Sequence, residues 1–148
     1  MTGNDILNFL NTGVIHGINI GMSVASVKDT LGIPNENTGD ENIGYLFYGI
    51  LSLGYYKNTI DGIAINFFKD KTINVLIDEN DFGESAVING NTQIHEFIYL
   101  LNSRTLLWEC SNTKELDYFT IRSKKGVGVI FDLYDGRLNR LSYAGHSL

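Results

Sequence analysis

Apolar residues recur along the chain at two spacings, and these spacings separate the expected helices from the expected strands. Intervals of three and four residues, which place side chains on one helical face, occur in three stretches. Alternating or continuous aromatic and branched residues, which favour strands, fill much of the remainder. The expected helices cover residues 5–10, 24–31 and 92–101. The expected strands cover residues 44–49, 51–56, 63–67, 72–77, 106–110, 118–122, 127–134 and 138–143.

Polar residues and glycines mark where several of these elements begin and end. Ser23 is expected to cap the second helix, because its hydroxyl can accept a free first-turn N–H, and Gly32 is expected to end it. Either Asn91 or Thr92 is expected to cap the third helix. Residues 35–42 are polar and predict a loop.

Two Asp-Gly pairs suggest a relationship between the two halves of the chain. Asp61-Gly62 and Asp135-Gly136 each predict a hairpin turn, and they are 74 residues apart. An internal duplication and a chance alignment both account for this offset. The element order predicts an α+β fold built on antiparallel sheet, as a single compact domain over residues 1–148. A duplication would divide that domain into pseudo-repeats at about 14–80 and 90–145.

Composition limits the classes of protein to consider. The chain has 148 residues, a net charge of −6 and 43% hydrophobic residues, which argues against disorder. A sequence pI near 4.9 disfavours a protein that binds the nucleic-acid backbone. No run of 18 apolar residues is present, so no membrane span is expected. The polar N-terminus does not resemble a signal peptide, and the expected location is the cytoplasm.

The sequence contains no recognisable catalytic signature. His95-Glu96 begins an H-E-x-x-H match, but Tyr99 stands where the second histidine would be. Cys110 is the one cysteine, and a free cysteine is most often a small buried hydrophobe. Nucleophile-elbow, Walker and dinucleotide-binding motifs are absent. We therefore expect no enzyme, metal or cofactor, unless a deep pocket brings His95, Cys110 and acidic residues together.

Acidic residues and tyrosines are the candidates for contact with a partner protein. Residues 1–103 have a net charge of −8 and residues 104–148 a net charge of +2. Acidic clusters are usually solvated loops, but they also attract basic partners. Adjacent strand residues face opposite sides of a sheet, so one of each tyrosine pair should face outward. The candidate partner-binding residues are Asp40, Glu41, Tyr55, Tyr56, Asp78, Glu79, Asp81 and Glu84.

Residues 18–34, INIGMSVASVKDTLGIP, are followed by the aromatic segment Tyr45-Leu46-Phe47-Tyr48. This arrangement resembles the helical segment of two groups, the SmpA/OmlA-type outer-membrane lipoproteins and the β-lactamase inhibitor proteins. The resemblance covers about 40 residues. It implies an α+β fold that binds proteins and has no catalytic activity. The β-lactamase inhibitor proteins are tandem repeats, and the length of one repeat is similar to the 74-residue offset between the two Asp-Gly pairs. The paired cysteines of the secreted inhibitors are missing here, so their target is not carried over.

In size, acidity and expected location the chain is also similar to the immunity proteins of bacterial toxin systems, including those of contact-dependent growth inhibition. The sequence therefore predicts an immunity protein that neutralises a cognate, basic, nuclease-type toxin by tight stoichiometric binding. The alternative is a non-catalytic assembly module related to the outer-membrane lipoproteins. Neither interpretation predicts an oligomeric state.

Overall fold

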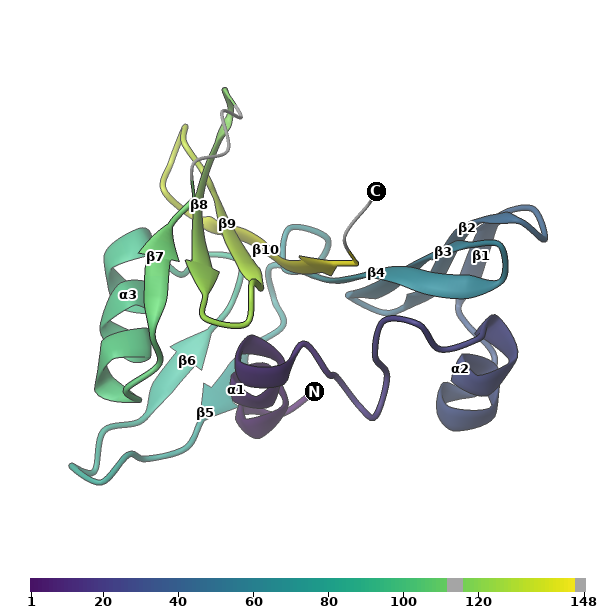
Figure 1. The fold of residues 1–148 in the computed structure, drawn as a ribbon. Helices are drawn as coiled ribbons and strands as arrows, with labels where there is room; N and C mark the ends of the chain where they lie inside the picture. The colour runs from purple at the N-terminus through teal and green to yellow at the C-terminus, as the bar shows by residue number, and fades with distance from the viewer. Residues whose placement is uncertain (112–115, 146–148) are drawn as a thin grey trace.

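An eight-stranded antiparallel sheet runs through the molecule, with a separate two-stranded sheet beside it (Figure 1). The structure is a computed structural model, and the description covers residues 1–111 and 116–145. The helices are α1 (Gly3–Thr12), α2 (Val24–Leu31) and α3 (Ile94–Ser103). The strands are β1 (Glu36–Gly39), β2 (Ile43–Tyr48), β3 (Leu51–Tyr56), β4 (Thr59–Asn66), β5 (Val75–Ile77), β6 (Ala86–Ile88), β7 (Trp108–Cys110), β8 (Tyr118–Ser123), β9 (Gly128–Asp132) and β10 (Leu138–Ala144). The α+β class with antiparallel sheets is confirmed.

The large sheet consists of two four-stranded meanders that meet at their last strands. The strand order is β1-β2-β3-β4-β10-β9-β8-β7. β4 and β10 pair antiparallel at the centre, with Ile65 opposite Leu141 and Ile63 opposite Tyr143. A helix followed by four antiparallel strands thus occurs twice, as α2 with β1–β4 and as α3 with β7–β10. Duplication as the origin of this order stays a prediction.

The helix termini follow the local sequence, with one correction. Ser23 caps α2 and accepts a hydrogen bond from the Ser26 N–H at 3.1 Å, as expected. The cap of α3 is Gln93, so the expectation of Asn91 or Thr92 is wrong. The Glu96 carboxylate accepts a hydrogen bond from the Gln93 N–H at 2.7 Å, which satisfies a donor that the first helical turn leaves free.

The prediction of a hairpin turn at Asp61-Gly62 is also wrong. The β3–β4 hairpin turns at Lys57 and Asn58, whose φ angles are +49° and +62°, the conformation of a tight two-residue hairpin turn. Asp61 and Gly62 lie inside β4, where the pairing with β3 shifts between Gly54 and Tyr55. This β-bulge leaves Asp61 as the extra residue. The two Asp-Gly pairs are therefore not equivalent in the fold.

Two strands form where the sequence did not predict them. β1 lies within residues 35–42, the predicted loop, and pairs with β2 as the counterpart of β7 at the other edge. β6 follows the acidic residues and pairs with β5, so the segment predicted at residues 72–77 joins the small sheet. Both strands form because they pair with a neighbouring strand, and this pairing overrides the weak β-strand propensity of their own residues.

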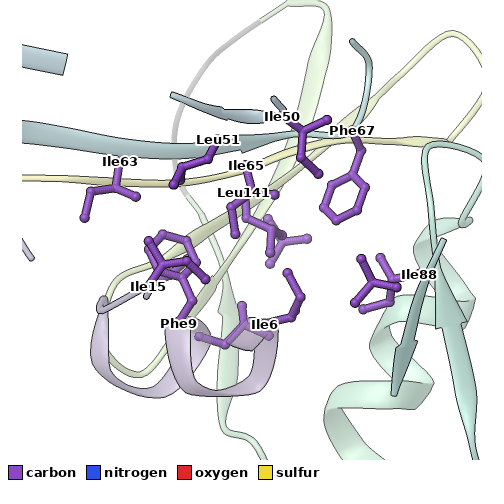
Figure 2. Close-up of a cluster of buried hydrophobic side chains, with 14 of the residues drawn as sticks. Ile6, Phe9, Ile15, Ile50, Leu51, Ile63, Ile65, Phe67, Ile88 and Leu141 are labelled. Atoms are coloured by element: carbon purple, nitrogen blue, oxygen red, sulfur yellow. The ribbon is translucent and has the colours of Figure 1, made fainter. Parts of the chain in front are cut away.

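The hydrophobic core lies on one face of the large sheet, between the sheet and the helices. Figure 2 shows Ile6 and Phe9 of α1 beside Ile65 and Leu141, which come from the two central strands. Phe97 of α3 meets Phe131 of β9 edge to face, with ring centroids 5.9 Å apart. Burial of one such side chain contributes about 1.5–3 kcal/mol. All three helices therefore pack on the same face.

Candidate protein-binding face

The opposite face of the large sheet is the candidate site, because no helix in the described ranges packs on it. We call it the open face. Outside the irregularities in β4 and β10, its side chains alternate with those of the core along the strands. Ile130 is only 7% exposed but stays outside the core cluster, as its position on this face requires. The open face includes Tyr45, Phe47, Ser52, Gly54, Tyr56, Gly62, Ala64, Asn66, Tyr118, Thr120, Arg122, Gly128, Ile130, Arg140 and Ser142.

Small residues in the central strands make the open face hollow. The register places Gly54 opposite both Tyr45 and Gly62, and Ser52 opposite Ala64. A Cβ added at Gly62 would find no atom within 4 Å, so there is free space above this glycine. Tyr45 and Tyr56 line the same hollow and are each about half exposed. The result is a depression with glycine at its floor and tyrosines on its wall.

A satisfied polar pair stiffens the floor of this hollow. Asn66 is 6% exposed, and its Nδ2 donates to Ser52 Oγ at 2.8 Å and to the Ile50 carbonyl at 3.1 Å. Buried polar groups are stable when their hydrogen bonds are made within the protein. These bonds fix β3 against β4, so the hollow has a defined shape before any partner arrives.

Cations of the chain itself lie against most aromatic rings of the open face. Lys69 Nζ lies 3.6 Å from the Phe47 ring centroid, and Lys57 Nζ lies 5.2 Å from that of Tyr56. The Arg140 guanidinium lies 5.7 Å from the Tyr118 ring. Aromatic and arginine side chains of this kind carry much of the binding energy of protein interfaces.

The β-bulge brings a carboxylate to the open face. The position that a Cβ at Gly54 would occupy is 3.2 Å from Asp61 Oδ1 and 3.3 Å from Tyr45 Cε1. Asp61 therefore stands beside Tyr45, over the glycine floor. Bulges commonly redirect a side chain in this way. The sequence predicted Asp61 in a turn. The feature that could have indicated its position within β4 is the competing hairpin turn at Lys57 and Asn58.

The two adjacent tyrosines point to opposite sides of β3, as strand alternation predicts. Tyr56 is 51% exposed and Tyr55 only 4% exposed. The Tyr55 hydroxyl donates its hydrogen bond to the Asp40 carbonyl at 2.7 Å, and Asn37 Oδ1 lies 3.2 Å from the same oxygen. Tyr55 thus braces the β1–β2 turn, which leaves Tyr56 as the member of this pair that can contact a partner.

Asp40 and Glu41 occupy that β1–β2 turn. Asp40 Oδ1 accepts hydrogen bonds from the Asn42 N–H at 2.7 Å and the Ile43 N–H at 3.1 Å. These backbone hydrogen bonds lower the pKa of the Asp40 carboxyl. One carboxylate oxygen of Asp40 is therefore committed to holding the turn, whereas the Glu41 side chain is exposed.

The acidic cluster joins β5 to β6, and it is ordered by specific contacts. We call residues 75–88 the acidic hairpin. Asn80 Oδ1 accepts hydrogen bonds from the N–H groups of Phe82 and Glu84, at 3.0 and 2.9 Å. Arg104, the C-cap residue that follows α3, donates to the carbonyls of Asp78 and Glu84. The Arg104 side chain therefore holds the backbone of the hairpin and binds none of its carboxylates.

The candidate acidic residues do not form one surface. Asp78, Glu79, Asp81 and Glu84 belong to the acidic hairpin, at one end of the molecule, whereas the β1–β2 turn lies at the other end (Figure 1). Neither group lies on the open face. The six candidate acidic residues are thus divided between two distant places.

The two residues considered for catalysis, His95 and Cys110, lie on different elements, α3 and β7. Cys110 is exposed in β7, which makes the expectation of a buried cysteine wrong, and His95 is exposed on α3. His146 lies outside the described residues. In the described ranges, no group of three or more histidine, cysteine, aspartate or glutamate side chains is placed to hold a metal ion. Over the same ranges, no helix is long and apolar enough to cross a membrane.

Comparisons of the chain with protein-family models, with curated proteins and with solved structures give no match.

Proposed function

We propose that this chain is a non-catalytic inhibitor of the immunity type, which neutralises a cognate protein toxin by binding it stoichiometrically through the open face. One observation supports this most strongly. A whole face of an eight-stranded sheet is free of helices in the described chain and carries tyrosine, phenylalanine and arginine side chains. Antiparallel sheets often leave one face to water, but such faces are then mostly polar.

The size of the open face fits a protein partner. Strands lie about 4.8 Å apart and rise about 3.3 Å per residue, so eight strands of five residues span about 34 Å by 17 Å. This area of about 600 Å² approaches the roughly 800 Å² that each partner contributes to a standard interface. The hollow is open to solvent, and among the described residues it holds no group of three or more histidine, cysteine, aspartate or glutamate side chains, which favours binding of a protein over turnover of a small molecule.

The test is neutralisation of a toxin encoded beside this chain, because immunity genes commonly adjoin toxin genes. Cells that express the neighbouring protein are expected to grow only when this chain is co-expressed. Calorimetry with the purified proteins is expected to give one-to-one binding at nanomolar Kd or tighter. Salt is expected to weaken binding mainly through the association rate.

Gly62→Leu locates the interface, because a Cβ at this position would find no atom of the fold within 4 Å and the added side chain would project into the hollow. We expect at least about tenfold weaker binding with the melting temperature preserved. Ser85→Leu, which adds the same side chain to the exposed acidic hairpin, is the matched control. Equal loss for both variants, or loss only for Ser85→Leu, would contradict docking on the open face.

The alternative is an assembly module that binds a partner without neutralising it. Binding that depends on Gly62 but gives no rescue of growth would support this alternative and rule out the immunity role. A neighbouring gene product that binds no better than serum albumin would contradict the proposed function.

A further inference from the structure

The hollow of the open face holds one aromatic ring and one carboxylate that the described chain leaves without a cation. Phe47, Tyr56 and Tyr118 each have a lysine or arginine of the chain against the ring. Tyr45 has none in the ranges that the structure describes. Beside it stands Asp61, which forms no ion pair or hydrogen bond through its carboxylate within those ranges. The ring without a cation is therefore the one next to a free carboxylate.

We propose that Tyr45 and Asp61 form a recognition site for an arginine side chain of the partner protein. A guanidinium can lie flat on an aromatic ring while its edge donates hydrogen bonds to a carboxylate, and lysine has no such planar fork. Tyr45 and Asp61 flank the position that a Cβ at Gly54 would occupy, at 3.3 Å and 3.2 Å. The inference rests on the proposed function, because it names the chemistry that the partner presents to the open face.

The surroundings of the site favour a cation from outside the chain. Arg140 also lines the hollow, but its guanidinium is directed to Tyr118, and it makes no ion pair with Asp61. Lys57 lies over Tyr56 at 5.2 Å. Tyr45 is 54% exposed, so its ring is accessible to a side chain that approaches the sheet.

The glycine floor provides the room that this arrangement requires. Gly54 lies directly beneath the two groups, and any side chain there would contact both of them. Gly62 pairs with Gly54 on the neighbouring strand and has open space above it. Two opposed glycines thus keep the depression free beside a ring and a carboxylate, which is the shape that an incoming long side chain would fill.

A titration with a small arginine probe tests the inference without the partner. N-acetyl-arginine amide is added to ¹⁵N-labelled protein, and N-acetyl-citrulline amide serves as the uncharged probe of the same shape. We expect saturable shifts of the Gly54 and Gly62 amide signals with arginine, at a Kd on the order of 1–10 mM. Citrulline is expected to bind at least about fivefold more weakly. Equal shifts with both probes, or none with arginine, would overturn the inference.

Variants separate the site from general electrostatic attraction. Asp61→Asn removes the charge and keeps the shape, and Tyr45→Leu removes the ring. Each is expected to weaken arginine binding by about fivefold or more. Asp81→Asn removes the same charge from the acidic hairpin and is expected to leave binding unchanged. Unchanged amide signals away from the hollow show that each variant is folded, and loss of binding in Asp81→Asn equal to that in Asp61→Asn would contradict a defined site.

The same variants distinguish failure of this inference from failure of the proposed function. If Gly62→Leu weakens binding of the toxin but Asp61→Asn leaves its affinity within about twofold, the open face is the interface and the arginine site is wrong. If no toxin binds, the proposed function fails, and the probe titration alone decides whether the hollow recognises arginine.

Discussion

The hydroxyl of Tyr99 in α3 donates a hydrogen bond to the carboxylate of Glu84 in the acidic hairpin, 2.9 Å from Oε2 and 3.0 Å from Oε1. Arg104, one turn further along the chain, binds the backbone carbonyl of the same glutamate at 2.9 Å. Two side chains from the end of α3 thus hold one residue of the hairpin. The acidic cluster is consequently attached to the main body through α3.

The pKa of Tyr99 tests this attachment. The hydrogen bond to Glu84, followed by the repulsion from its negative charge, raises the pKa of the Tyr99 hydroxyl. Because the protonated hydroxyl is the donor, the contact is complete below the ordinary tyrosine pKa and is lost as pH rises through the raised value. Glu84→Gln should shift the NMR titration of the Tyr99 ring to lower pH. The control Asp81→Asn should leave that titration in place, and an unchanged titration in Glu84→Gln would contradict the contact.

Removal of the Tyr99 hydroxyl should loosen the hairpin locally. In Tyr99→Phe we expect faster amide hydrogen exchange at Glu84 and its neighbours, because Arg104 and Asn80 then hold the hairpin alone. The exchange of core strands such as β4 should not change. Faster exchange throughout the chain would instead indicate that Tyr99 supports the whole fold.

Substitutions at Asp40 test whether its carboxylate holds the β1–β2 turn or attracts a partner. Both of its hydrogen bonds from backbone N–H groups end on Oδ1, an oxygen that asparagine also has. Asp40→Asn should therefore keep the NMR signals of Asn42 and Ile43, whereas Asp40→Ala should shift both. Weaker toxin binding by Asp40→Asn, with the turn intact, would show that the charge itself makes contact.

The same turn should respond to acid. Hydrogen bonds from the Asn42 and Ile43 N–H groups lower the pKa of Asp40, so the ionised form is favoured in the folded chain. The stabilisation that ionised Asp40 gives to the folded turn is present above the ordinary aspartate pKa. It is lost as pH falls through the lowered pKa of Asp40. The amide signals of these two residues should titrate with a midpoint below the ordinary aspartate value. An unshifted midpoint would contradict the observed hydrogen bonds.

The two Asp-Gly pairs should respond differently to alanine. Gly136 has φ +72°, and a Cβ there would lie 2.9 Å from Gln93 Oε1, so Gly136→Ala should lower the free energy of unfolding by about 1–2 kcal/mol. Gly62 lies in a strand with open space around it, and Gly62→Ala should change that energy by less than about 1 kcal/mol, in the stabilising direction. Denaturant titrations measure both values. Equal destabilisation would contradict the bulge in β4.

Leu141 tests whether the two meanders unfold together. It is fully buried on β10, opposite Ile65 of β4, at the junction of the two halves. Leu141→Ala should cost about 2–5 kcal/mol through lost burial and a residual cavity. Fluorescence of Trp108 and exchange of β3 amides should report one transition in this variant. Two separate transitions would show that the halves are independent units.

Much of the fold follows from local patterns in the sequence. The helices α1, α2 and α3 carry apolar stripes, and Ser23 and Gly32 mark the two ends of α2 as expected. The aromatic and branched runs at β2, β3 and β8 are strands, as predicted. These signals are readable because helix capping and side-chain periodicity depend on residues close together in the chain.

The errors arise where distant segments decide the structure. Glu36–Gly39 is polar and becomes β1 because β2 offers it hydrogen-bond partners. Asp61-Gly62 has the composition of a turn, but Lys57-Asn58 turns the chain first, and the remaining residue is accommodated as a bulge. A single sequence cannot rank such competing turns, because the choice depends on the pairing of β3 with β4.

By itself, the sequence determined the α+β class, the alternation that separates Tyr55 from Tyr56, and the uneven acidity. Only the tertiary structure decided which acidic residues matter to the proposed interface. It placed the acidic hairpin and the β1–β2 turn at opposite ends, and it brought Asp61 beside Tyr45 on the open face. The physical reason is that a binding face is defined by strand register, and register depends on hydrogen bonds between residues far apart in the chain.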